Sequence, residues 1–133
     1  VLVLARDADD YVTFRARLYE GADGFFYPLI CDSRETVPLT FAILVLSQGD
    51  VRRAITYGVN LGRDADTIAS MVGAIVGALH GVEGIPPEWV RKARQFSARD
   101  QERLALDLVR TAIAKQLDQS AAAERLATLC RAT

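Results

Sequence analysis

The sequence predicts an all-α protein, a multi-helix bundle around one buried central helix. Three observations favour this fold class. Apolar residues recur at helical spacing through most of the 133 residues. Residues that typically begin helices stand in front of these segments. We find no convincing strand pattern, repeat or low-complexity tract, and we expect residues 1–133 to belong to a single domain.

The first segments predict a short apolar element, a surface helix and a loop. Val1–Ala5 is a short apolar run that could be a strand or the remainder of a helix. Ala8–Glu20 carries apolar side chains every three to four residues with charges between them, and Gly21 ends this helix. Residues 21–35 show no period and predict an ordered loop, whose aromatic residues pack inward or line a cleft.

Two further helices are predicted before the central one. Thr36 is a suitable N-cap, Pro38 is tolerated in a first turn, and Leu39–Leu46 is densely apolar, which predicts a buried helix. Asp50 is expected to cap the next helix. Its apolar stripe is Val51, Ala54, Ile55 and Val59. Residues 60–63 form the turn after it.

The central helix is predicted from Ile68–Leu79, where only Ser70 is polar, and is expected to be buried on every side. Ala69, Gly73 and Gly77 are spaced by four residues and therefore share one face. An interior glycine costs a helix about 1 kcal/mol relative to alanine. The spacing therefore predicts close contact with another helix.

After Gly81 the sequence predicts helices to the end of the chain. Pro86 and Pro87 begin one, and Trp89 is expected to anchor it. Ser97 and Asp100 resemble a capping box for a helix that extends to about residue 117. A last helix, over about residues 120–131, follows or continues it.

Asp64, Asp66 and Thr67 precede the apolar run of the central helix. Acids and hydroxyls at a helix N-terminus cap free backbone N–H groups and suit the helix dipole. The same oxygens are the ligands that Mg²⁺, Mn²⁺ or Ca²⁺ prefer. The spacing alone leaves capping and metal binding open.

The wider string GRDADTIASMVGAIVGALHG, followed by Gly84, Ile85-Pro86 and Trp89, resembles the C-terminal signature of the ADP-ribosylglycohydrolase family. Glu35-Thr36-Val37-Pro38, Gly49-Asp50 and Val59-Asn60-Leu61-Gly62 follow the same order of elements as in that family. Roughly residues 32–89 are covered well. Arg63 departs from the pattern, because many members carry a second glycine there.

This resemblance implies a helical hydrolase that cleaves ADP-ribose from a protein side chain or a small acceptor. It implies a binuclear Mg²⁺ or Mn²⁺ centre in which Asp64, Asp66 and Thr67 are ligands. Gly62 and Arg63 would border the site as substrate-binding residues, Arg63 either pairing with a phosphate or forming a structural ion pair. The general base is not assigned.

Members of the family are longer, and their N-terminal half carries a Thr-Asp-Asp ligand motif that this sequence lacks; Asp9-Asp10 follow an alanine. We therefore expect a C-terminal half that is inactive alone and is completed by the missing N-terminal half or a companion chain. The alternatives are a non-catalytic module that binds ADP-ribose or a nucleotide, and a purely structural helical module.

The composition of the chain bears on which classes of partner it can bind and on its compartment. A net charge of −1 offers no electrostatic footprint for nucleic acid or for an anionic membrane surface. Cys31 and Cys130 have no companion ligands nearby and are expected to be buried or incidental thiols of a reducing compartment. With no signal peptide evident, we expect a cytoplasmic protein.

Overall fold

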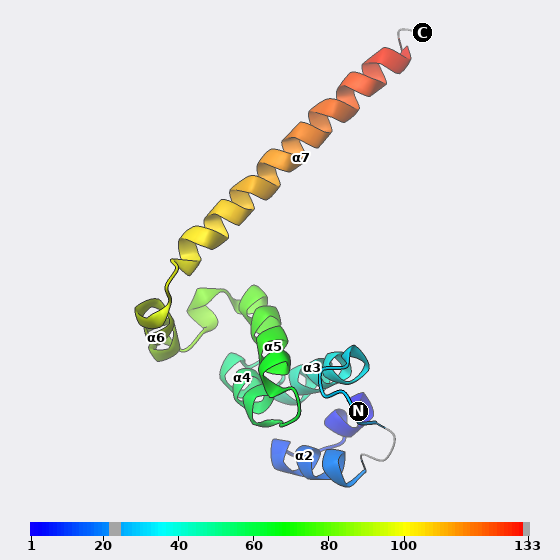
Figure 1. Ribbon diagram of the computed structural model, residues 1–133, viewed down its shortest axis with the longest axis vertical. Coiled ribbons are helices and arrows are strands. Elements are labelled where there is room, and N and C mark those ends of the chain that lie inside the picture. The colour runs from blue at the N-terminus through cyan, green and yellow to red at the C-terminus, as the bar shows by residue number, and fades with distance from the viewer. Residues whose placement is uncertain (22–24, 132–133) are drawn as a thin grey trace. The chain divides into compact units, whose positions relative to one another are not determined.

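Helices make up all the regular structure in the computed structural model, which describes residues 1–21 and 25–131; no strand occurs in these ranges (Figure 1). Residues 22–24 of the predicted loop lie outside the described residues. The elements are α1 (Leu2–Arg6), α2 (Tyr11–Glu20), α3 (Ser33–Ser47), α4 (Val51–Asn60), α5 (Ala65–His80), a 3-10 turn η1 (Val82–Gly84), α6 (Pro87–Phe96) and α7 (Gln101–Arg131). The all-α prediction is confirmed.

The chain divides into two compact units, residues 1–90 and 91–133. In the first unit α4 and α5 pack along one another, α3 contacts both, and α1 packs on α3 and α2. Figure 1 shows α3, α4 and α5 side by side in the first unit. The largest fully buried apolar side chains here are Phe14, Leu39, Ile43, Leu61, Ile68, Val72 and Val76.

Aspartates begin three of these helices by capping. The carboxylates of Asp10, Asp32 and Asp50 accept hydrogen bonds from the backbone N–H groups of Thr13, Arg34 and Arg53, at 2.7, 2.9 and 2.7 Å. The prediction for Asp50 is confirmed.

The predicted start of α3 is wrong. Asp32, rather than Thr36, is the N-cap, because its carboxylate bonds both the backbone and the guanidinium of Arg34. Thr36 is buried within the helix, and Pro38 lies beyond the first turn.

Burial of α5 is confined to one face, so the prediction that every side is buried is also wrong. Ile68, Val72 and Val76 are fully buried against the first unit's core, whereas Ala74 and Leu79 on other faces are exposed. Apolar composition alone does not decide which faces other elements cover.

Small residues let α4 and α5 approach closely at one end of their contact. A Cβ on Gly58 would lie 3.1 Å from the Cα of Ala69, and one on Gly73 would lie 3.9 Å from Ile55. Nothing lies within 4 Å of the corresponding position on Gly77 among the described residues. The predicted close contact is therefore confirmed at Ala69 and absent at Gly77. Val59, predicted in the apolar stripe of α4, is exposed.

In the second unit, the last predicted segment continues the helix before it, which is one of the two options that the sequence left open. The Asp100 carboxylate accepts from the Arg103 backbone N–H at 3.0 Å, and α7 then continues for 31 residues to Arg131. Ser97 bonds the neighbouring Arg99 and Gln101 instead of capping α7. Both cysteines are exposed, contrary to a buried role. Among the described helices, none has the length and apolar composition needed to cross a membrane.

Candidate functional site

The predicted site residues lie on the loop from Leu61 to Asp64 and on the first turn of α5. The loop is anchored at its start by α2. The carbonyl oxygen of Leu61 accepts hydrogen bonds from Arg15 Nε and from the Tyr19 hydroxyl, both at 3.0 Å. Leu61 itself is fully buried. This anchor fixes where the loop leaves α4.

Gly62 is required by the backbone and by its surroundings. Its φ of +95° lies in the region that favours glycine, and a Cβ at this position would collide with the Tyr19 hydroxyl. The same hydroxyl that holds the Leu61 carbonyl therefore excludes a side chain at the next residue.

Arg63 forms a second anchor, toward α3 and the loop before it. Its Nε and Nη2 atoms donate to the two carboxylate oxygens of Glu35, at 2.7 and 2.8 Å, and Nη2 also donates to the Tyr27 carbonyl at 2.6 Å. The guanidinium carbon lies 4.7 Å from the centre of the Phe26 ring. Of the two roles left open for Arg63, the structure contains the ion pair; phosphate binding stays a prediction.

Glu35 was not predicted as part of the site. Its side chain is fully buried, and its Oε2 atom also accepts from the Tyr27 backbone N–H at 3.0 Å. Burial raises the pKa of this carboxyl, but the Arg63 and Tyr27 hydrogen bonds and the Arg63 charge outweigh it and hold the pKa below its ordinary value. The pair is therefore ionised at neutral pH.

Asp64 differs from the other aspartates at helix starts in this unit. It occupies the N-cap position of α5, yet its side chain accepts no capping hydrogen bond from the backbone of that helix. The residue is only 8 % exposed, and its Oδ2 atom is buried without a hydrogen-bond partner in the described part of the chain. Leaving a buried polar atom unpaired costs about 1–3 kcal/mol. Capping therefore does not account for this carboxylate.

Asp66 and Thr67 follow in the first turn of α5, and both are exposed. The structure thus places Gly62, Arg63, Asp64, Asp66 and Thr67 within one loop and one helical turn, as the sequence implied. Over residues 1–21 and 25–131, however, no three His, Cys, Asp or Glu side chains gather closely enough to hold a metal ion alone. The donors here form at most part of a coordination shell.

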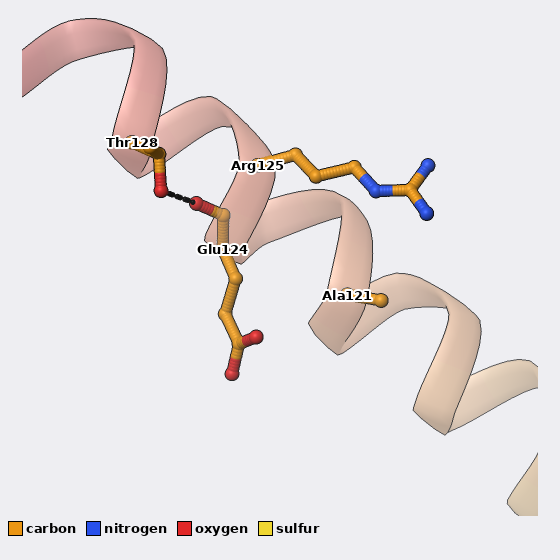
Figure 2. Close-up of a pocket in the computed structure, with 4 residues that line it drawn as sticks. All are labelled: Ala121, Glu124, Arg125 and Thr128. Carbon is orange, nitrogen blue, oxygen red and sulfur yellow. Dashed lines mark hydrogen bonds between the residues drawn. The ribbon is translucent and has the colours of Figure 1, made fainter. Parts of the chain in front are cut away.

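Two depressions lined by other residues occur in the described part of the chain. Figure 2 shows one on α7, lined by Ala121, Glu124, Arg125 and Thr128; Glu124 and Arg125 point to different sides of the helix, and Thr128 Oγ1 donates to the Glu124 carbonyl. All of its lining comes from a single helix, so it has no opposing wall.

The second depression, of about 460 Å³, lies in the first unit beside the stacked rings of Tyr11 and Tyr57, whose centres are 4.4 Å apart. Burial raises the pKa of the Tyr11 hydroxyl, which has no hydrogen-bond partner within the described ranges. None of the predicted site residues lines either depression.

Known proteins resemble the chain over most of its length. The sequence model of the ADP-ribosylglycohydrolase family matches residues 3–126. The uncharacterized protein YegU of Escherichia coli (strain K12) is 35% identical over 120 residues, which are 89% of this chain and 32% of YegU. The chain therefore spans about a third of the length of that relative.

Shorter matches include two proteins named for hydrolase activities. ADP-ribosylhydrolase ARH3 of Mus musculus is 38% identical over 64 residues, covering 48% of this chain and 15% of ARH3. ADP-ribosylarginine hydrolase Tri1 of Pseudomonas putida (strain GB-1) is 46% identical over 48 residues, covering 36% of this chain and 13% of Tri1. No solved structure matches the chain. The family match covers nearly the whole helical chain and includes the Asp64 loop, so the chain belongs to the ADP-ribosylglycohydrolase family.

Proposed function

We propose that this chain forms one side of a divalent-metal centre in a hydrolase that releases ADP-ribose from a protein side chain or a small acceptor. Asp64, Asp66 and Thr67 are its ligands for Mg²⁺ or Mn²⁺, in a centre with two ions. The observation that carries the proposal is the buried Oδ2 atom of Asp64, which has no partner in the described residues although the loop before it is held at both ends.

The donor chemistry of these residues suits hard cations. Two carboxylates and a hydroxyl supply oxygen ligands, and Asp64 lies at the positive end of the α5 dipole, where a negative charge is favoured. When bound, such ions orient a water molecule and the hydroxyls of a ribose and stabilise negative charge on oxygen. This chain's residues contribute a fixed carboxylate at Asp64 and two exposed donors, Asp66 and Thr67, beside it.

The remaining ligands are proposed to come from a missing N-terminal half or from a companion chain. Three donor residues cannot complete two six-coordinate shells, and the described residues offer no further cluster. YegU extends well beyond the 120 residues that it shares with this chain, which supports the same proposal. We expect the isolated chain to release no ADP-ribose. The general base is left unassigned.

Paramagnetic broadening by Mn²⁺ in NMR spectra of the chain tests the metal assignment, because it detects weak binding and locates it. We expect the amides of residues 62–68 to broaden first, and this to be lost in Asp64→Asn. Asp50→Asn is the matched control, since Asp50 is an exposed carboxylate at the start of α4 that already caps the helix. Broadening that is uniform, or that persists in Asp64→Asn, would refute the assignment.

A further inference from the structure

We propose that Arg63 and Glu35 form a positioning pair that holds the Asp64 carboxylate in place for its ligand. The inference rests on the proposed metal role of Asp64 and assigns Arg63 to the protein's own framework. Neither residue touches the metal in this account; both act through the loop.

The backbone of Arg63 gives the first argument. Its φ is +58°, a left-handed conformation that costs a residue with a Cβ about 1–2 kcal/mol. Glycine would adopt it without that cost. The contacts of the Arg63 side chain therefore offset the cost of this backbone conformation. They are the two carboxylate oxygens of Glu35, the Tyr27 carbonyl and the face of the Phe26 ring.

Hydrogen bonds from two other segments of the chain hold the loop before Asp64. Tyr27 donates its backbone N–H to Glu35 and accepts at its carbonyl from Arg63, so one residue of the preceding loop contacts both members of the pair. Arg15 and Tyr19 meanwhile hold the Leu61 carbonyl. Two anchors thus act on residues 61 and 63, immediately before Asp64.

The ion pair with Glu35 also keeps the Arg63 guanidinium from pairing with the carboxylate of the next residue, Asp64. Arg63 and Asp64 are adjacent, yet the guanidinium is aligned with Glu35, which is fully buried and ionised. The Asp64 Oδ2 atom consequently remains without a hydrogen-bond donor among the residues that the structure describes. Removing the Glu35 charge would release the Arg63 guanidinium. Arg63 could then form an ion pair with the Asp64 carboxylate and compete with the metal for it.

Mn²⁺ titrations of the chain, followed by broadening of the amides of residues 62–68, test the inference with Arg63→Gly and Glu35→Gln. Loss of a group that orients a metal ligand typically costs 10–100-fold in affinity. We expect the Mn²⁺ affinity of both variants to fall at least about tenfold. The control is Arg53→Ala, at an exposed arginine near the start of α4, and its affinity should not change. Wild-type affinity in Arg63→Gly would show that only the backbone conformation matters and would overturn the inference.

Amide hydrogen exchange without metal separates positioning from general stability. Positioning predicts faster exchange at residues 61–64 in Glu35→Gln, with protection in the α5 core at Ile68 and Val72 retained. Loss of protection throughout the first unit would instead make the pair a support of the whole core and overturn the inference. If the wild-type chain itself shows no local Mn²⁺ broadening, the metal function fails rather than the positioning.

Discussion

Replacing Asp64 by alanine is expected to stabilise the metal-free chain, although the residue stands where caps usually stabilise helices. The side chain accepts no N–H bond from α5, so the substitution removes no cap. It does remove a buried carboxylate oxygen that has no partner within the described residues. The substitution therefore reports directly on whether this carboxylate serves the fold or a ligand.

The magnitude follows from two opposing effects. Removing an unpaired buried polar group regains about 1–3 kcal/mol. Removing a negative charge from a helix N-terminus loses about 0.3–1 kcal/mol. The net gain is roughly 1 kcal/mol, which corresponds to a rise in Tm of about 4–8 °C for a unit of this size. Asp50→Ala should do the opposite, because it deletes a 2.7 Å cap bond that contributes about 1 kcal/mol.

Thermal unfolding followed by circular dichroism at helical wavelengths, in a buffer containing a chelator, measures both variants. The change in Tm should have opposite signs for these two aspartates, which occupy the same N-cap position on consecutive helices. A fall in Tm for Asp64→Ala as large as that for Asp50→Ala would mean that Asp64 is a cap, and the metal proposal would lose its main support. The same variant should not bind Mn²⁺, so stability and ligand binding should change in opposite directions.

Three further outcomes can be checked on the same chain. The pKa of Glu35 is lower in the folded chain than its ordinary value of 4.5, so its ionised form stabilises the fold above pH 4.5. This stabilisation is lost as the pH falls through the lower, folded-state pKa. Tm should therefore fall less steeply with acidification in Glu35→Gln than in the wild type. Gly62→Ala should destabilise the chain by at least about 1 kcal/mol, because φ is positive there and a Cβ would collide with the Tyr19 hydroxyl. Gly77→Ala, where a Cβ on α5 would meet open space, should stabilise the chain by up to about 1 kcal/mol. Equal changes in the free energy of unfolding, measured with denaturant, would contradict this difference. Tyr19→Phe should cost about 1 kcal/mol and speed amide exchange in residues 61–64, and unchanged exchange there would show that the hydroxyl does not anchor the loop.

Local signals predicted the helices well, because they depend on a few neighbouring residues. Asp50, Gly81 and Pro87 mark helix ends where the structure has them. The start of α3 was misplaced because Asp32 and Thr36 are both plausible caps, and the choice depends on an ion pair between Asp32 and Arg34.

Longer-range features could not be predicted from spacing. Glu35 and Arg63 are 28 positions apart, and nothing in either segment states that they meet. The signal that was present is an acidic residue beside a strongly apolar stretch, which suggests a buried partner. The one-sided burial of α5 is likewise a property of its neighbours, since the sequence alone gives only how apolar the helix is.

The double hydrogen bond to the Leu61 carbonyl has a consequence for mutational scans. Arg15 and Tyr19 lie 46 and 42 positions before the residue that they hold, on a different helix and outside the acidic motif. A library selected for function should therefore show intolerant positions on one face of α2 that resemble site mutations in phenotype. Diversifying the motif alone would leave Arg15 and Tyr19 unsampled, and a motif grafted onto another helical protein would need two equivalent donors to the carbonyl before it.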